Sequence, residues 1–272
     1  MTKGCNRMNG MLTEIREKIQ TSDIVLVGLG EKLQYGWDKL IADTRYQEIE
    51  AEINNREEYI WIIPFLQKMV LNQNEDERLK DAYLTLKELV DGKNYFIVSL
   101  CMDDYVYRYG FPENRVVTPC GGFRKMQCDV NCDGSLKDVP MEIYHKVEQY
   151  YKKEITLDML QEPICEKCGQ KLRFNQLGVT KYAEQGYLDI WAEYTKWLQG
   201  TVNRKLCVLE LGVGLEYPSV IRFPFEKIVF YNQKAFLYRV HPSLYQLGEE
   251  IAEQGKGIKA DPVDFLQKTF VN

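Results

Sequence analysis

Asp23-Ile24-Val25-Leu26-Val27-Gly28-Leu29-Gly30 is the stretch that decides the fold. Its apolar, β-branched run shows no alternation with polar residues, which is typical of a parallel strand covered on both faces. The run stops at two closely spaced glycines, and a glycine turn directly after a strand favours a crossing into a helix. We therefore expect this strand to lie in a parallel sheet.

Similar apolar runs recur along the chain and predict further strands of the same sheet. They cover residues 95–100, 115–118, 205–211 and 228–232. Apolar residues at helical spacing predict helices over 11–20, 37–57, 60–71, 76–90, 182–199 and 243–254. Strands that alternate with helices indicate βαβ units, so we predict an α/β fold with a Rossmann-like, mostly parallel sheet.

The composition excludes several classes of protein. The 272 residues carry 35 Lys+Arg and 40 Asp+Glu, a formal net charge of −5, and 45% of them are hydrophobic, which is enough for a core. A mildly acidic chain without a basic run releases few counterions from a phosphate backbone, so we expect no nucleic-acid partner. No run approaches about 20 apolar residues, so we expect no membrane span. The N-terminus lacks the apolar centre of a secretory signal, and we expect a cytoplasmic protein.

Two close cysteine pairs lie where the alternation of strands and helices is interrupted. Cys128 and Cys132 form a CxxxC pair, and Cys165 and Cys168 form a CxxC pair. This spacing is typical of four thiolates that hold one tetrahedral Zn²⁺, with Gly169 relieving the turn after the second pair. The alternative is two unrelated pairs of thiols. We predict an inserted module with a structural zinc ion.

The glycine turn after the first strand is a candidate phosphate site. Glycines let backbone N–H groups approach a phosphate, which makes Gly28 and Gly30 candidate binding residues. The third glycine of a GxGxxG pattern is replaced by Leu33, and Glu31 brings a negative charge that Lys32 only partly offsets. The residues fit a plain strand–helix turn equally well.

A second glycine turn, Gly212-Val213-Gly214, ends the predicted strand over 205–211. Two such turns at the ends of parallel strands favour a ligand crevice more than either turn alone.

In this order, these features resemble those of the sirtuins, which are NAD-dependent protein deacylases and ADP-ribosyltransferases. The resemblance extends over nearly the whole chain. The matching stretches are Val27-Gly28-Leu29-Gly30, Ser99-Leu100-Cys101-Met102-Asp103, Pro119-Cys120-Gly121-Gly122-Phe123, the four-cysteine insertion, Gly212-Val213-Gly214 and Tyr231-Asn232. The sequence of residues 211–218, followed by Arg222-Phe223-Pro224-Phe225, is most similar to that of the bacterial class M sirtuins, which ADP-ribosylate a lipoyl-carrier protein.

The resemblance implies NAD and zinc as cofactors, a protein substrate or partner such as a lipoyl carrier, and a role for each matched residue. Asp103 is expected on the nicotinamide carboxamide and Asn232 on the adenosine ribose. Cys101 and Cys120 stand at the catalytic positions, where the family has a loop asparagine and a histidine (glutamine in class M). The remaining cofactor-binding residues implied by the resemblance are Gly28, Gly30, Ser99, Gly212 and Gly214.

Departures from the family pattern affect the expected chemistry. Lys32, Val213 and Gly214 replace hydroxyl residues, and Leu177 aligns with an arginine that serves catalysis in class M. The reference pKa of a cysteine is about 8.5, so Cys120 acts as a base only if its pKa is lowered.

Neither histidine of the chain, His145 or His241, falls in the matching loops. We therefore expect no ordinary deacetylase activity. The thiols of Cys101 and Cys120 can form a redox pair, supply a nucleophile, or serve only as small apolar fillers.

The sequence thus predicts three units and leaves two functions open. The units are a Rossmann-like NAD-binding domain over 1–34, 93–124 and 178–272, a helical segment over 35–92 and a zinc-binding module over 125–177. One function is a divergent sirtuin-like NAD-dependent protein ADP-ribosyltransferase or deacylase with altered catalytic residues. The other is a catalytically inactive sirtuin-like pseudoenzyme that binds a nucleotide or a protein.

Overall fold

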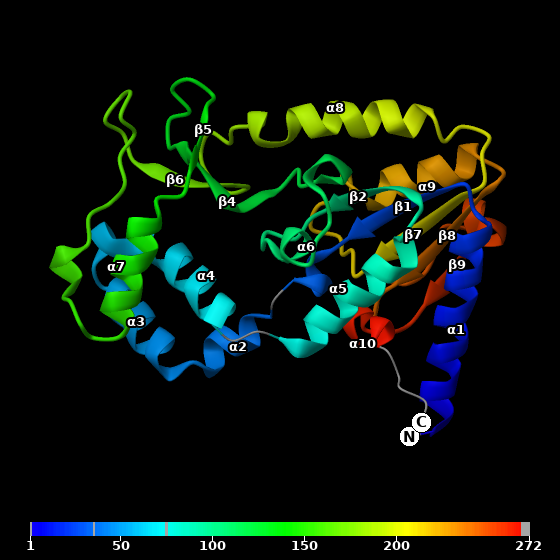
Figure 1. Ribbon diagram of the computed structural model, residues 1–272, viewed down its shortest axis with the longest axis horizontal. Helices are drawn as coiled ribbons and strands as arrows, with labels where there is room; N and C mark the ends of the chain where they lie inside the picture. Colours follow the sequence, from blue (N-terminus) through cyan, green and yellow to red (C-terminus); the bar gives the residue numbers. More distant parts are fainter. Residues whose placement is uncertain (1, 35, 74–75, 268–272) are drawn as a thin grey trace.

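A computed structural model of the chain describes residues 2–34, 36–73 and 76–267. It consists of a main lobe, which contains a six-stranded parallel sheet, and a small lobe, which contains a three-stranded sheet and helices (Figure 1). Among the described helices, none combines the length and the apolar character that crossing a membrane requires.

The main sheet has the strand order β3-β2-β1-β7-β8-β9. Its strands are β1 (Ile24–Leu29), β2 (Asn94–Ser99), β3 (Val116–Val117), β7 (Leu206–Leu211), β8 (Ala235–Val240) and β9 (Gly255–Ile258). Numbered within this sheet, the order is 3-2-1-4-5-6, which is that of doubly wound dinucleotide-binding folds. The order reverses between β1 and β7, so the crevice outside the carboxyl ends of these two strands is where such folds bind a ligand.

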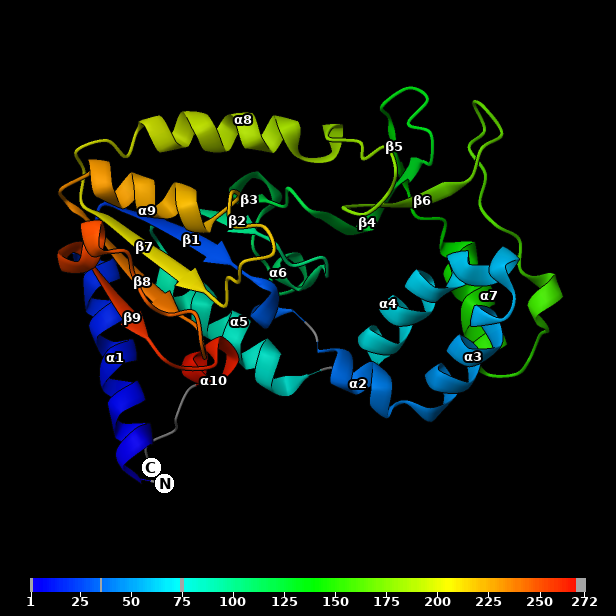
Figure 2. The same ribbon diagram turned by 180° about the vertical axis from the view of Figure 1, so that it is seen from behind.

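Helices cover both faces of the main sheet (Figure 2). One face of the sheet is covered by α1 (Thr2–Thr21), α5 (Glu77–Val90), α6 (Tyr105–Arg108) and α10 (Pro262–Leu266). The opposite face is covered by α8 (Gln185–Gln199) and α9 (Arg222–Tyr231). Along β1, Val25 and Val27 pack into the first layer, whereas Ile24 and Leu26 pack into the second. Burial on both faces explains why the run is apolar without alternation.

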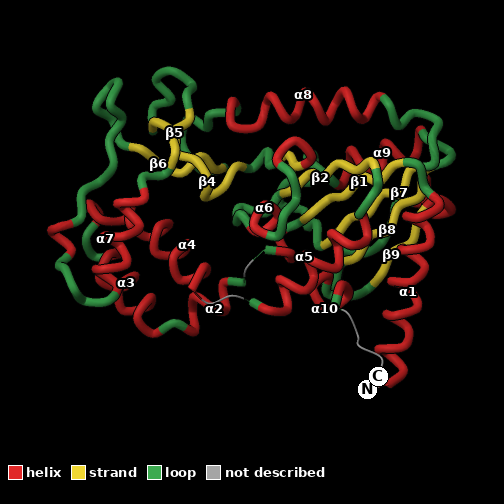
Figure 3. The backbone as a smooth tube through the Cα atoms, viewed as in Figure 1, coloured by secondary structure: helices red, strands yellow, loops and turns green. Residues whose placement is uncertain are grey.

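The small lobe joins two stretches of chain around one apolar core. Its antiparallel sheet has the order β5-β4-β6, formed by β4 (Gly121–Cys128), β5 (Leu136–Asp138) and β6 (Leu172–Gln176). Against it pack α2 (Trp37–Ala42), α3 (Thr44–Asn54), α4 (Ile63–Gln73) and α7 (Met141–Tyr151), with Phe65 and Phe174 at ring contact. Figure 3 shows the long loops that connect these short elements. The 3₁₀ helices of the chain cover Glu31–Leu33, Glu57–Ile62, Glu113–Arg115, Leu157–Met159 and Glu249–Gln254.

The predicted α/β fold is confirmed, with corrections to three elements. The helix predicted over 37–57 is divided at Asp43 into α2 and α3. Residues 228–232 do not form a strand: they end α9, whose buried face carries Phe225 and Val229 while Phe230 and Tyr231 are exposed. The strand at this place is β8, which the sequence analysis missed. The helix predicted over 243–254 is also wrong, because only the 3₁₀ helix over Glu249–Gln254 forms there.

The predicted helical segment over 35–92 divides between the lobes. Helices α2 to α4 share the core of the small lobe. The apolar face of α5, with Leu79, Tyr83 and Leu86, instead packs against the main sheet.

Candidate functional site: a crevice between two glycine turns

The two glycine turns contact each other at the carboxyl ends of β1 and β7. The N–H of Gly30 donates to the carbonyl of Leu211 at 2.8 Å, and the N–H of Lys32 donates to the carbonyl of Gly212 at 3.3 Å. A β-carbon on Gly30 would overlap the backbone of Gly212 and Val213, so this approach requires glycine. The structure therefore brings the turns together at the point where the strand order reverses.

Several N–H groups of these turns are available to a ligand. Gly212 adopts a φ of +65° and donates its own N–H to Val240 at 2.8 Å. Within the described residues, the backbone N–H groups of Glu31, Val213 and Gly214 have no acceptor. Unpaired N–H groups in glycine turns are a common device for binding phosphate, so this end of the sheet fits a pyrophosphate.

Gly28, in contrast, has a packing role. It lies inside β1, and a β-carbon there would lie 2.6 Å from Cγ2 of Ile221 and 2.8 Å from Cε2 of Phe225. Its missing side chain lets α9 approach the sheet, and the structure does not support the predicted contact of Gly28 with the cofactor.

The end of β2 and the loop after it carry three of the predicted site residues. Oγ of Ser99 accepts the N–H of Cys101 at 3.1 Å, and Sγ of Cys101 lies 3.3 Å from the carbonyl oxygen of Gly30. Oδ1 of Asp103 accepts the N–H of Tyr105 at 3.2 Å. Asp103 also lines a cavity of about 230 Å³. The structure thus places Ser99 and Cys101 beside the first glycine turn, with Asp103 further along the same loop.

Both candidate catalytic thiols are buried and neutral. Cys101 and Cys120 are each 1% exposed. Burial, and then the charges of Asp103 and Glu31, raise the pKa of Cys101 far above its usual range. Burial, and then the charges of Glu216 and Glu31, raise the pKa of Cys120 to about 12. Neither thiol is ionised near pH 7, so neither can serve there as a thiolate nucleophile or base.

Asn232 lies at the opposite end of the sheet from the crevice. It follows α9, and its side-chain amide donates to the carbonyl oxygens of Thr201 and Arg204, both at 3.1 Å. Thr201 and Arg204 precede β7, at the amino end of the strands. The structure therefore does not support the expected contact of Asn232 with a ribose.

The polar residue at the carboxyl end of β8 is His241, which the sequence analysis did not assign to the site. It is 3% exposed, and its Nδ1 accepts the N–H groups of Ser243 at 3.1 Å and Leu244 at 2.9 Å. Because Nδ1 accepts, this network assigns the ring proton to Nε2. Burial, and then the charge of Arg222, lower the pKa of His241. The sequence could have indicated this residue, because a polar residue directly after an apolar run stands where a strand ends.

A buried network of charges lies beneath the late glycine turn. Arg239 donates two hydrogen bonds to the Glu210 carboxylate, at 2.7 and 2.9 Å, and Arg222 donates to the carbonyl of Val213 at 2.6 Å. Arg222 also lies 3.3 Å from Oε1 of Glu210. Burial raises the pKa of Glu210. The network joins β7, β8 and α9 to the turn. The sequence could have indicated it, because Glu210 and Arg239 are charged residues that each lie inside an apolar run.

The four cysteines of the insertion come together in one cluster. Their sulfur atoms all lie within 4.8 Å of one another, and the Cys128–Cys168 and Cys132–Cys165 sulfur pairs are 3.4 and 3.8 Å apart. Tetrahedral zinc with bonds of about 2.3 Å separates its sulfur ligands by about 3.8 Å, so the cluster fits Zn²⁺. Gly169 adopts a φ of +73° in the turn after the second pair, as its predicted role requires.

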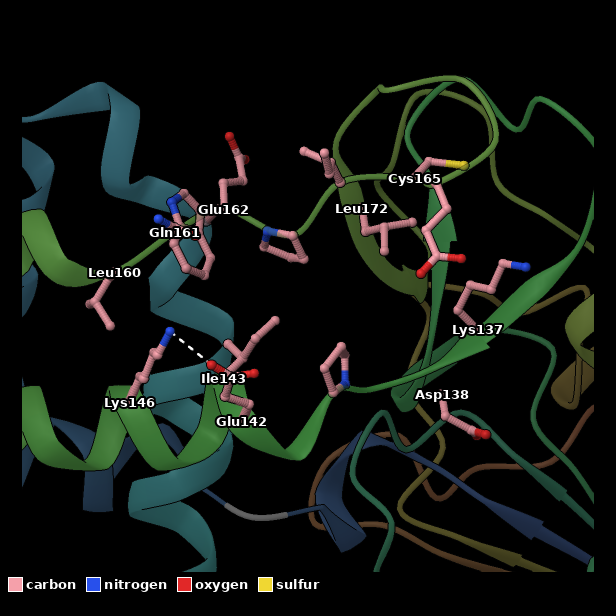
Figure 4. A pocket seen from close by; sticks show the side chains of 15 residues that line it. Lys137, Asp138, Glu142, Ile143, Lys146, Leu160, Gln161, Glu162, Cys165 and Leu172 are labelled. Atoms are coloured by element: carbon pink, nitrogen blue, oxygen red, sulfur yellow. Dashed lines mark ion pairs between the residues drawn. The ribbon is translucent and has the colours of Figure 1, made fainter.

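A separate cavity of about 470 Å³ lies in the small lobe (Figure 4). It lies between α7 and residues 160–166, and an ion pair of 2.9 Å joins Lys146 and Glu142 at its wall. Among the predicted site residues only Cys165 lines it. This cavity is thus distinct from the crevice at the main sheet.

Two curated proteins similar to the chain carry the name ADP-ribosyltransferase. No family model matches the chain. A "Protein ADP-ribosyltransferase" of Staphylococcus aureus (strain Mu50 / ATCC 700699) is 21% identical over 258 residues, which cover 88% of this chain and 81% of that protein. A "Probable bifunctional ADP-ribose hydrolase/ADP-ribosyltransferase" of Fusarium oxysporum f. sp. cubense is 26% identical over 144 residues, which cover 51% of this chain and 24% of that protein.

The similar solved structures are sirtuins. Sir2Tm bound to a propionylated peptide aligns with a TM-score of 0.54 and 16% identity, over 94% of this chain and 95% of that one. A Sir2 homolog–NAD complex aligns with a TM-score of 0.56 and 14% identity, over 94% and 91% of the two chains. The chain therefore has the sirtuin fold, and the predicted resemblance is confirmed at this level.

Proposed function

We propose that the chain is a divergent sirtuin-type, NAD-dependent protein ADP-ribosyltransferase. The observation that carries the proposal is the contact between the two glycine turns where the strand order reverses. There the N–H groups of Glu31, Val213 and Gly214 have no acceptor among the residues that the structure describes. The sirtuin fold and the names of the two curated relatives support the same activity.

The proposed roles follow from this position. Gly30, Gly212 and Gly214 shape the turns around the pyrophosphate of NAD, and Asp103 receives the nicotinamide carboxamide. Ser99 supports the loop that carries Asp103, because its Oγ accepts a hydrogen bond from the N–H of Cys101. NAD is a substrate here, since the reaction breaks its bond between nicotinamide and ribose.

The small lobe is proposed to hold zinc without taking part in the chemistry. The cluster formed by Cys128, Cys132, Cys165 and Cys168 supplies four ligands, which leaves no open coordination position on a tetrahedral ion. Zinc would then connect the end of β4 to the turn over residues 165–169, which precedes β6.

The acceptor is proposed to be a protein. Similar solved structures include one bound to a propionylated peptide and one bound to a p53 peptide. The resemblance of residues 211–225 to the class M sirtuins favours a lipoyl-carrier protein among such acceptors. Deacetylation is not proposed, because neither Cys101 nor Cys120 provides a base near pH 7.

The raised pKa values of these two thiols also favour a second candidate, a pseudoenzyme that binds NAD without consuming it. The test is to incubate the zinc-loaded protein with NAD and with lipoylated or unmodified carrier protein. If the protein transfers ADP-ribose, we expect release of nicotinamide and an increase in the mass of the carrier protein by one ADP-ribosyl group, measured by mass spectrometry. NAD binding without nicotinamide release would support the pseudoenzyme.

A further inference from the structure

Transfer of ADP-ribose to an oxygen acceptor requires a group that takes up the acceptor's proton. The two residues at the expected catalytic positions do not meet this requirement. Cys101 and Cys120 are each 1% exposed, and both thiols hold their protons near neutral pH. Nδ1 of His241 is occupied by two backbone N–H groups, and the network assigns a proton to Nε2. A base must therefore come from another side chain at the crevice.

Glu31 is the candidate carboxylate of the crevice. It directly follows Gly30, whose carbonyl oxygen lies 3.3 Å from Sγ of Cys101. Its charge also contributes to the raised pKa values of the Cys101 and Cys120 thiols. Glu216 acts on Cys120 and is exposed to solvent, whereas Asp103 acts on Cys101 and accepts the N–H of Tyr105.

The position of Glu31 is set by the junction of the turns. It directly follows Gly30, whose N–H is bound to Leu211 and whose carbonyl oxygen lies 3.3 Å from Sγ of Cys101. Its half-buried side chain extends to Gly214, where a β-carbon would overlap the carboxylate. In the part of the chain that the structure describes, neither an ion pair nor a hydrogen bond engages this carboxylate.

We propose that Glu31 is the general base of the NAD-consuming reaction. In the simplest case the acceptor is water, whose oxygen forms a bond to C1′ of the nicotinamide ribose. The bond between C1′ and nicotinamide breaks, and its electron pair neutralises the pyridinium ring. Glu31 takes the proton from the water and later releases it to solvent, so the products are ADP-ribose, nicotinamide and a proton. A protein hydroxyl replaces water in the transfer reaction. The inference rests on the proposed function.

This role connects two departures from the sirtuin pattern. The resemblance places a serine at position 214, and a serine β-carbon would overlap the Glu31 carboxylate. Glycine at 214 creates the space that the acid occupies. Position 120 lacks the family's histidine, and the charge of Glu31 contributes to the raised pKa of the cysteine that stands there.

The test compares Glu31→Gln with Glu216→Gln in the full-length, zinc-loaded protein. Both substitutions remove one negative charge that acts on Cys120, but only Glu31 also acts on Cys101. Nicotinamide release from NAD is measured across pH, and the affinities for NAD and ADP-ribose are measured by calorimetry. We expect Glu31→Gln to bind NAD without loss of affinity and to release nicotinamide about 100-fold more slowly than the wild type at every pH measured. We expect Glu216→Gln to behave like the wild type.

Three results would overturn the inference and leave the proposed function intact. The first is nicotinamide release by Glu31→Gln at the wild-type rate. The second is an equal loss of rate in Glu216→Gln, which would indicate a general effect of charge. The third is loss of NAD binding by Glu31→Gln, which would make Glu31 a binding residue. If the wild-type protein neither binds nor consumes NAD, the proposed function itself fails.

Discussion

The carboxylate of Glu31, in the turn after β1, lies directly against Gly214, in the turn after β7. The same two turns are joined by the hydrogen bond from Gly30 to Leu211. Each turn thus limits the side chains that the other can carry, and the crevice is one unit formed by two distant parts of the chain.

Gly214→Ala should displace the Glu31 carboxylate and leave the fold intact. The atoms that a β-carbon would meet belong to the end of a flexible side chain, which can rotate away. We expect the free energy of unfolding to change by less than about 1 kcal/mol, while nicotinamide release falls as it does in Glu31→Gln. Urea denaturation and a nicotinamide assay measure the two effects. A normal rate would show that the contact has no role in turnover.

Gly30→Ala should instead destabilise the protein. Here the β-carbon would overlap backbone atoms of Gly212 and Val213, which no rotamer change relieves. We expect a loss of about 2–3 kcal/mol in the free energy of unfolding. The control is Gly248→Ala, because Gly248 has a φ of −63° and no atom within 4 Å of a β-carbon. Equal stabilities of the two variants would contradict the close contact of the turns.

The sheet could be predicted from sequence where its strands are mostly apolar runs, as in β1, β2 and β7, although β7 contains Glu210. β8, which contains Arg239, was missed because the apolar run over 228–232, just before it, was assigned as the strand. The partner of Arg239 is Glu210 on the adjacent strand, so the pair is recognisable only when the strand register is known.

The same kind of information separates the site residues that local sequence can indicate from those that depend on tertiary structure. The zinc ligands were predictable because each pair is local, and only their meeting required the fold. Asn232 was misplaced because the end of α9 presents Phe230 and Tyr231 to solvent next to buried Val229, and this apolar run reads like a strand. Glu31 was visible as a charge beside Gly30, but its contact with Gly214 depends on tertiary structure.

Removal of zinc should destabilise the small lobe. Cys128 and Cys165 belong to the apolar core that also contains Phe65 and Phe174. We expect one zinc ion per chain, and we expect chelation or Cys165→Ser to lower Tm by roughly 10 °C, since 1 kcal/mol corresponds to about 2–4 °C for a chain of this size. Cys207→Ala, in β7, is the control and should keep its zinc. Unchanged Tm after complete chelation would exclude a structural metal.

Arg239→Met should make stability depend on pH. The substitution leaves the buried Glu210 carboxylate without its two hydrogen bonds, which costs about 3–5 kcal/mol near neutral pH. Its pKa, already raised by burial, should rise further. Between the unfolded and folded pKa values the native state then holds one more proton than the unfolded state, so stability falls as pH rises, by about 1.4 kcal/mol per pH unit.

Urea denaturation at several pH values between 5 and 8 measures this slope. The double variant Arg239→Met/Glu210→Leu removes the titrating group and should lose the added dependence on pH. A single variant with the wild-type pH profile would show that Glu210 does not depend on Arg239.

Calorimetric titration of the zinc-loaded protein with NAD tests the central claim most directly, with ADP-ribose and nicotinamide as comparison ligands. The account predicts micromolar binding of NAD and of ADP-ribose, which share the pyrophosphate, and weaker binding of nicotinamide alone. Absence of binding up to millimolar NAD, by a protein that is folded and carries its zinc, would contradict the claim that the two glycine turns form a dinucleotide site.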